Sequence, residues 1–172
     1  MKISFYYVDE DYINYLKEVE INSRGFTTVP NVRYANSSKF VYGVVLKIDD
    51  IDYYVPISSY KKSQEDNIII KIEDHKKLVA RGSMRFNFMI PIPKQCLIPV
   101  DFKDSMFTEQ EKVMLQKEYK ACKKLLVQAQ KRAKKTYDKV LAGLDTELLK
   151  NSCDFKLLEE ACKNYSPKKE EK

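Results

Sequence analysis

The N-terminal part of the chain alternates short runs of apolar, β-branched and aromatic residues with polar breaks. This pattern is typical of short strands, and the run at 83–90 alternates apolar and polar side chains as a half-buried strand does. The aspartate-rich stretch at 49–52 predicts a tight turn that joins its two neighbouring runs in a hairpin. The expected strands cover residues 2–8, 40–48, 53–57, 67–72, 83–90 and 97–102. Such strands predict a small, curved antiparallel sheet or barrel.

Helical spacing begins directly after the first expected strand. Asp9 can cap a helix, and apolar residues recur at Tyr12, Ile13 and Leu16, so a helix is predicted over residues 10–20. Glycine, proline and asparagine then punctuate residues 22–38, and this segment is expected to be irregular.

The C-terminal part of the chain is predicted to be helical from Thr108 onward. Thr108 and Glu111 have the capping-box arrangement, and apolar residues follow at steps of three or four up to Gly143. Glycine commonly ends helices, so one long amphipathic helix is predicted between these positions. A shorter helix or two is expected over residues 145–165, and a frayed tail over 166–172. Strands followed by helices place the chain in the α+β class.

The long predicted helix is strongly basic, and so is the chain, with a net charge of +6 and a pI near 9.0. Between Lys112 and Lys139 there are ten basic and two acidic residues. Such an excess favours a polyanionic partner, either nucleic acid or an anionic membrane, although a solvated outer face is the simpler alternative. The densest basic positions are Lys123, Lys124, Lys131, Arg132, Lys134 and Lys135.

Length and composition narrow the classes of function further. A chain of 172 residues predicts one domain over 1–172 with a real core. We find no signal-peptide pattern and no run long enough to cross a membrane, so a cytoplasmic protein is expected. The four cysteines lack paired spacing and His75 is the single histidine, which argues against a metal site and predicts reduced thiols. No glycine-rich phosphate loop is present, and no cofactor is expected.

The stretch at 56–64 carries the most suggestive chemistry. Pro56 marks a strand end or edge, and Ser58, Ser59, Lys61 and Lys62 follow it closely. Hydroxyl groups beside ammonium groups are what metal-independent cleavage of a phosphodiester requires. The plain alternative is a solvated polar loop.

Several segments together resemble the ToxN/AbiQ family, the endoribonuclease toxins of type III toxin–antitoxin systems. The similarity runs over nearly the whole chain and is strongest at residues 12–18, 39–46, 56–62 and 85–93. It implies a compact, barrel-like antiparallel sheet of the MazF-like toxin fold with packed helices. It also implies metal-independent RNA cleavage, in which a 2′-hydroxyl attacks the neighbouring phosphate and leaves a 2′,3′-cyclic phosphate and a 5′-hydroxyl.

The resemblance also implies a set of catalytic residues. The family pattern Thr-Ser-x-Lys reads Ser58-Ser59-Tyr60-Lys61 here, with serine where threonine is usual and tyrosine where proline often stands. Lysines neutralise developing charge, serine positions or relays a proton, and tyrosines bind phosphate or stack bases. For Tyr12, core packing is an equal alternative. The implied catalytic residues are Ser59, Lys61, Ser58, Lys39, Tyr34 and Tyr12.

RNA is the expected partner. Arg33, Lys62 and Arg85 are expected to contact RNA together with the basic positions of the long helix, and Arg85 from the exposed face of its strand. The family implies an antitoxin made of repeated RNA that is processed into small structured units, and cellular or phage RNA is the expected substrate. We expect a ring-shaped toxin–RNA assembly if each RNA touches two toxin chains. A non-catalytic RNA-binding module is the main alternative. A membrane-surface role ranks last, because small residues such as Ala129 and Ala133 fill the apolar stripe of the helix.

Overall fold

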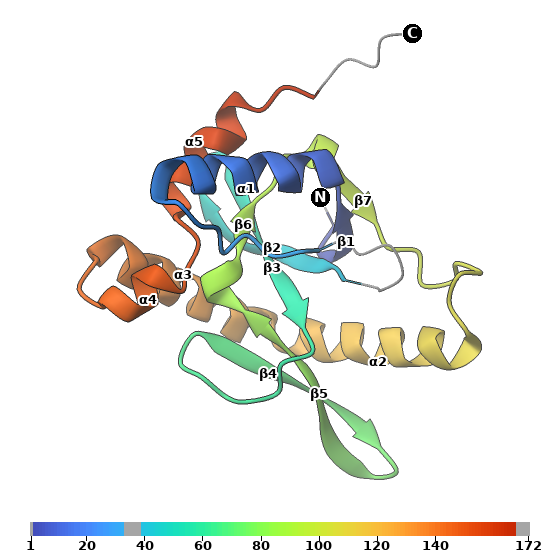
Figure 1. Ribbon diagram of the computed structural model, residues 1–172. Helices are drawn as coiled ribbons and strands as arrows, with labels where there is room; N and C mark the ends of the chain where they lie inside the picture. Colours follow the sequence, from blue (N-terminus) through green and yellow to red (C-terminus); the bar gives the residue numbers. More distant parts are fainter. Residues whose placement is uncertain (1, 33–38, 168–172) are drawn as a thin grey trace, which may run out of the picture.

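The computed structural model describes residues 2–32 and 39–167 and shows helices packed around an antiparallel sheet (Figure 1). All strand pairings within these residues are antiparallel. The strands are β1 (Ser4–Val8), β2 (Val41–Ile48), β3 (Ile51–Ser58), β4 (Asn67–Asp74), β5 (Lys77–Arg85), β6 (Ile90–Pro91) and β7 (Leu97–Pro99). The predicted α+β class and antiparallel sheet are confirmed.

The strand order is β4-β5-β3-β2-β1-β7, and β6 pairs with β3 beside this path. Among the described residues β4 and β7 have no second neighbour, so the sheet does not close into a barrel. The last strand ends at Pro99 instead of 102. The open edges correct the barrel-like expectation, while the central strands lie as predicted.

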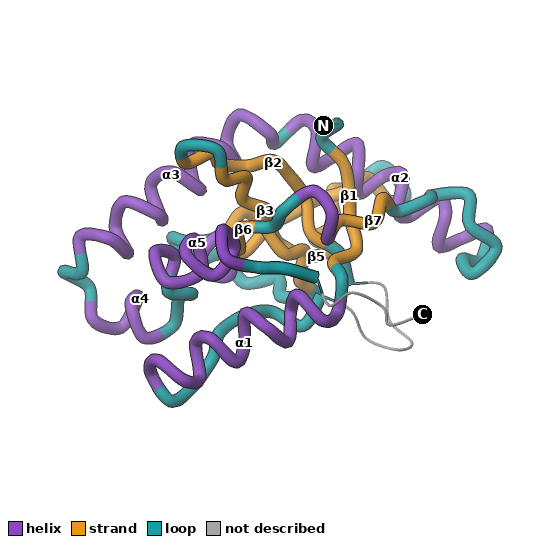
Figure 2. Tube along the Cα trace, turned by 90° about the horizontal axis from the view of Figure 1, so that it is seen from above, coloured by secondary structure: helices purple, strands orange, loops and turns teal. Residues whose placement is uncertain are grey.

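Helices cover both sides of the sheet. They are α1 (Glu10–Arg24), α2 (Glu109–Lys124), α3 (Leu126–Ala142), α4 (Thr146–Lys150) and α5 (Phe155–Asn164). Two views show α1 and α5 on one side of the strands and α2 and α3 on the other (Figures 1 and 2). The Tyr15 hydroxyl on α1 donates to the carbonyl of Ala161 on α5 at 3.0 Å, which ties these two helices together.

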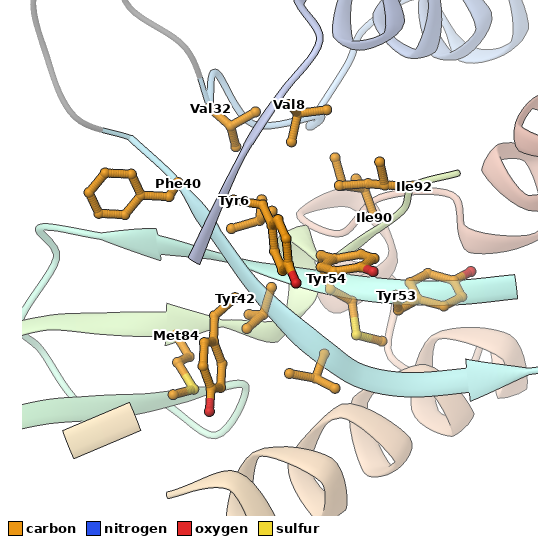
Figure 3. Packing of buried hydrophobic residues seen from close by; sticks show 14 of the residues in the cluster. Tyr6, Val8, Val32, Phe40, Tyr42, Tyr53, Tyr54, Met84, Ile90 and Ile92 are labelled. Atoms are coloured by element: carbon orange, nitrogen blue, oxygen red, sulfur yellow. The ribbon is translucent and has the colours of Figure 1, made fainter. Parts of the chain in front are cut away.

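Buried aromatic rings dominate the core. Side chains from β1, β2, β3, β5 and β6 meet in one cluster, which includes Tyr42, Tyr53 and Tyr54 (Figure 3). The hydroxyl of a buried tyrosine usually finds a hydrogen-bond partner. Tyr53 and Tyr137 both donate to the carboxylate of Glu159, at 2.8 and 2.6 Å. Burial raises the pKa of Tyr53, so its hydroxyl stays protonated and acts as a donor in this network.

The first helix is longer than predicted. Asp9 caps it as expected, but it ends at Arg24, before Gly25 in the left-handed conformation. The buried carboxylate of Glu20 explains the extra turn, because it pairs with Arg24 at 2.9 Å and accepts the backbone N–H of Thr28 at 2.9 Å. The end of α1 is therefore fixed by contacts with residues beyond the helix.

The single strand predicted over 83–90 is wrong. Strand β5 ends at Arg85, and Phe86–Phe88 form a 3₁₀ turn. Asn87, expected on an exposed face, is buried and donates its side-chain N–H to the carbonyl of Asn151 at 2.8 Å. A distant partner that satisfies a polar group overrides the local alternation.

Strand β5 starts earlier than predicted, because β4 and β5 form a hairpin that extends past α2 (Figure 1). Its turn residues, His75 and Lys76, both have positive φ, 47° and 63°. Turns of this kind usually contain asparagine or glycine, so the residue types at this turn did not indicate a hairpin. His75 lies on the surface, as expected.

The long predicted helix is two helices, α2 and α3, interrupted at Leu125. Its predicted ends are correct: Thr108 forms the capping box, and Gly143 follows α3 in the left-handed conformation. Leu125 and Leu126 both pack against the core, so tertiary contacts, not proline or glycine, accompany the interruption. Helices α4 and α5 confirm the helical prediction for 145–165.

All four cysteines, which lie in the described part of the chain, are free thiols. Cys96, Cys122 and Cys153 are buried, and burial raises the pKa of the Cys96 thiol to about 12. The expected reduced, partly buried thiols are therefore confirmed. Within the described residues, we find no helix that is long and apolar enough to cross a membrane.

Candidate active site

Three segments converge where strand β3 ends. Val41 pairs with Pro56, and the N–H of Ile57 donates to the carbonyl of Phe40 at 3.0 Å. The pairing therefore continues to Phe40, the residue that precedes β2. One further step along this antiparallel register brings Lys39 alongside Ser58. On the other side, Ser58 pairs with Ser83 of β5.

The candidate catalytic side chains face solvent at this convergence. Ser59, Lys61 and Lys39 are exposed, and Ser58 is half-buried. The sheet thus brings Lys39 beside Ser58, the last residue of β3, although the two are far apart in the chain. This end of the sheet therefore presents exposed hydroxyl and ammonium groups to solvent, and their part in catalysis stays a prediction.

Strand β5 approaches the first serine very closely. Gly82 lies against the backbone of Ser58, and a Cβ atom at this position would be 2.3 Å from the Ser58 carbonyl oxygen. Only glycine fits here without moving one of the two strands. The base of the candidate loop is therefore held by backbone packing against β5.

The loop after Ser59 is closed by its own hydrogen bonds. The Ser58 Oγ atom accepts the backbone N–H of Tyr60 at 3.1 Å. The buried Asn67 side chain donates to the carbonyl of Lys62 at 2.9 Å and accepts the N–H of Gln64 at 2.8 Å. The loop is therefore a structured turn, although its side chains at Ser59, Lys61 and Lys62 are exposed to solvent.

Arg132, predicted to bind RNA, anchors this loop. Its Nη1 atom donates to the carbonyls of Glu65 and Asn67, both at 2.7 Å. The Lys139 and Lys135 ammonium groups pair with the Glu65 side chain and hold the pKa of its carboxyl below the ordinary value. Part of the basic face of α3 is therefore occupied by the protein itself, because these side chains fasten the loop to the helix.

Other basic positions on this face remain exposed to solvent. Lys123 lies 5.6 Å from the centre of the Tyr119 ring, and Lys134 pairs with Asp138 at 2.5 Å. Lys124 and Lys131 are exposed and have no ion pair within the described residues. These four lysines lie where an extended polyanion can reach them.

Arg85 does not lie on a fully exposed strand face as expected, and its contact with RNA stays a prediction. It is half-buried, and its guanidinium carbon lies 4.7 Å from the Tyr60 ring centre and 4.5 Å from that of Phe88. Among the described residues its buried Nε atom has no hydrogen-bond partner. Two aromatic rings therefore cover the charge.

Tyr12 lies in the core, away from solvent. It is fully buried, its hydroxyl donates to the carbonyl of Pro91 at 2.6 Å, and burial raises its pKa. These contacts support the core-packing alternative for this residue. Two other predicted residues, Tyr34 and Arg33, lie outside the described residues.

The role of Asn67 was missed in the sequence. Its position after a polar linker was a weak signal, since asparagine commonly closes turns with its side chain. Over residues 2–32 and 39–167, we find no group of three or more histidine, cysteine, aspartate or glutamate side chains that could hold a metal ion.

Sequence comparison matches residues 4–163 to the family model "Toxin ToxN, type III toxin-antitoxin system". Endoribonuclease AbiQ from Lactococcus lactis subsp. lactis is 30% identical over 181 residues, covering 98% of this chain and 92% of that protein. Endoribonuclease ToxN from Bacillus thuringiensis subsp. kurstaki is 27% identical over 177 residues, covering 98% of this chain and 87% of the relative.

Solved structures show the same fold. AbiQ, described as a lactococcal anti-phage endoribonuclease of a type III toxin–antitoxin system, matches with a TM-score of 0.76 and 28% identity, covering 95% of this chain and 97% of the other. A chain from a second solved structure, described by selective toxin inhibition by a non-coding RNA pseudoknot in bacterial type III toxin–antitoxin systems, matches with a TM-score of 0.79 and 25% identity. The match covers 96% of this chain and 98% of the other. The resemblance in the sequence is thus confirmed, and the chain belongs to the ToxN family of type III toxin–antitoxin toxins.

Proposed function

We propose that the protein is an endoribonuclease toxin of a type III toxin–antitoxin system that acts against phage. The relatives named above are endoribonucleases, and one is described as anti-phage. The observation in this chain that carries the proposal is the placement of exposed Ser59 and Lys61 on the loop directly after β3, beside the start of β2, which Lys39 precedes. The whole chain, 1–172, acts as one domain in the cytoplasm, on cellular or phage RNA.

The proposed reaction is an internal transesterification of RNA. The 2′-oxygen loses its proton and bonds to phosphorus, while the bond from phosphorus to the 5′-oxygen breaks and that oxygen gains a proton. The products are a 2′,3′-cyclic phosphate and a 5′-hydroxyl. Lys61 and Lys39 neutralise the charge that develops on the phosphate oxygens, and Ser59 positions the phosphate or relays a proton.

Cleavage is expected to continue in excess EDTA. The nucleophile belongs to the substrate, and the stretch at 56–64 offers hydroxyl and ammonium groups and no carboxylate. The measurement incubates the protein with bulk RNA in chelator and examines the fragment ends for cyclic phosphate. Strict dependence on magnesium would redirect attention to the carboxylates of Asp49, Asp50 and Asp52. Binding without any fragments would favour a non-catalytic RNA-binding module.

The antitoxin in this proposal is RNA. The description of one similar solved structure states that a processed non-coding RNA regulates a bacterial antiviral system. The description of another states that a non-coding RNA pseudoknot inhibits the toxin. In this chain, the exposed lysines of α2 and α3 lie outside the candidate loop and offer a second, longer contact for a folded RNA. We propose that small structured repeats bridge several toxin chains in a closed ring.

Replacing Gly82 with alanine is expected to impair both stability and cleavage. The new Cβ would meet the Ser58 carbonyl at 2.3 Å, so β5 or the start of the candidate loop must shift. Overpacking of this kind costs about 1–3 kcal/mol of unfolding free energy. Urea unfolding measures the stability, and cleavage is compared per folded molecule.

Gly25→Ala is the matched control. Gly25 has a φ of +81°, and nothing lies within 4 Å of a Cβ placed there. Alanine is strained in this conformation by about 1–2 kcal/mol, but the site lies at the end of α1, away from the loop. This variant should lose stability and keep its cleavage per folded molecule. Equal activity in both variants would show that the β5 contact does not position the serines.

A further inference from the structure

An aromatic residue stands in the chain between two residues of the proposed mechanism. Tyr60 separates Ser59 from Lys61 in the chain, on the same closed loop. Its side chain is half-buried, with the Arg85 guanidinium over the ring at 4.7 Å from its centre. The residues on either side of Tyr60 in the chain, Ser59 and Lys61, are both exposed.

The orientation of this ring is fixed from two directions. Arg85 lies against Phe88 as well, at 4.5 Å, so the guanidinium is held between two rings and in turn supports Tyr60. At the backbone, the N–H of Tyr60 donates to Ser58 Oγ at 3.1 Å. A proline at this position has no N–H and cannot make that hydrogen bond. The loop therefore replaces the stiffness of proline with a hydrogen bond and a stacked cation.

We propose that Tyr60 is a stacking platform for a nucleobase beside the scissile phosphate. This proposal rests on the proposed ribonuclease function and names a residue that sets how the substrate is held. Unpaired bases stack on aromatic side chains, and a supporting guanidinium lowers the cost of holding the ring still. Because Tyr60 stands between the proposed catalytic residues Ser59 and Lys61, its ring is within reach of the nucleotides on either side of the phosphate.

Charge and placement favour a base over a phosphate as the ligand of this ring. Phosphate oxygens need hydrogen-bond donors, and Lys61 and Lys39 supply them nearby. A tyrosine ring offers a flat, polarisable face, and every base has a matching one.

The test compares Tyr60→Leu with Tyr60→Phe on a set of RNA oligonucleotides. One contains a site that the wild-type protein cuts; in the others, an abasic nucleotide replaces either residue flanking the cut. Leucine keeps the backbone N–H and some packing on Arg85 but lacks a flat ring. Tyr60→Leu should lower kcat/KM about tenfold on the complete site and much less on one of the abasic sites. Tyr60→Phe should restore the difference between the complete and abasic substrates.

The readout separates this inference from the proposed function. If the wild-type protein cuts no RNA, the ribonuclease proposal itself fails. If it cuts RNA and the leucine variant loses the same factor on complete and abasic substrates, Tyr60 only supports the loop and the stacking inference is overturned. Thermal unfolding of both variants shows whether a loss of activity reflects a loss of folded protein.

Discussion

Replacing Ser59 or Lys61 with alanine is expected to abolish RNA cleavage and toxicity while leaving the fold intact. Both side chains are exposed on the candidate loop, so their removal should change the unfolding free energy by about 0.5 kcal/mol or less. The loss of a group that stabilises charge or moves a proton in the transition state lowers the rate by about 10²- to 10⁴-fold. Single-turnover cleavage and growth after induction measure the two effects.

Two nearby positions provide controls of the same residue types. Ser63 is an exposed serine of the same loop, and Lys77 is an exposed lysine at the start of β5. Neither has been assigned a part in the reaction, so Ser63→Ala and Lys77→Ala should cut RNA at nearly the wild-type rate. Full activity in a well-folded Ser59→Ala/Lys61→Ala double variant would remove this loop from the active site.

The central strands could be predicted because their signal is local. Residues of β2 and β3 form nearly continuous apolar runs with a turn between them, and such runs are typical of buried strands. The 3₁₀ turn at Phe86–Phe88 could not be predicted in this way. It depends on Asn87, whose partners are Asn151 and the N–H of Cys153 at 2.9 Å, both far away in the sequence.

The candidate site also combines features that are local in the sequence with features that depend on distant residues. Ser58, Ser59 and Lys61 are neighbours in the chain, so the sequence alone was enough to propose them as a site. The anchoring of their loop depends on Arg132 and the carbonyl of Asn67, which are 65 positions apart in the sequence. Composition alone therefore could not separate a basic residue that binds the protein from one available to RNA.

The basic face of α2 and α3 thus has two parts with different roles. Arg132, Lys135 and Lys139 hold the segment at Glu65, and changing them would disturb the candidate loop directly. Lys123, Lys124 and Lys131 are exposed and have no ion pair with a described residue. A variant that tests RNA binding without altering the loop should change only this second group.

The triple variant Lys123→Gln, Lys124→Gln and Lys131→Gln is expected to weaken antitoxin binding more than it slows cleavage of a short substrate. A short RNA needs contacts only at the loop, whereas a folded RNA bound over a longer path also meets the helices. Each phosphate contact that is lost reduces the slope of log affinity against log salt by about 0.7–0.9, so the slope should fall by about 2–3. In cells, the variant should remain toxic when the antitoxin is present.

The control variant changes the same charge elsewhere on the surface, at Lys94, Lys103 and Lys163, all of which are exposed. Antitoxin affinity is measured against salt for wild type and both variants, alongside turnover of the short substrate and the mass of the toxin–RNA assembly. Wild-type slope and affinity in the first variant would place the inhibitory surface elsewhere, first around Arg81 and the entry to β2. A reduced slope with unchanged short-substrate turnover would assign Lys123, Lys124 and Lys131 to antitoxin binding. Antitoxin binding and cleavage of the short substrate would then depend on different residues.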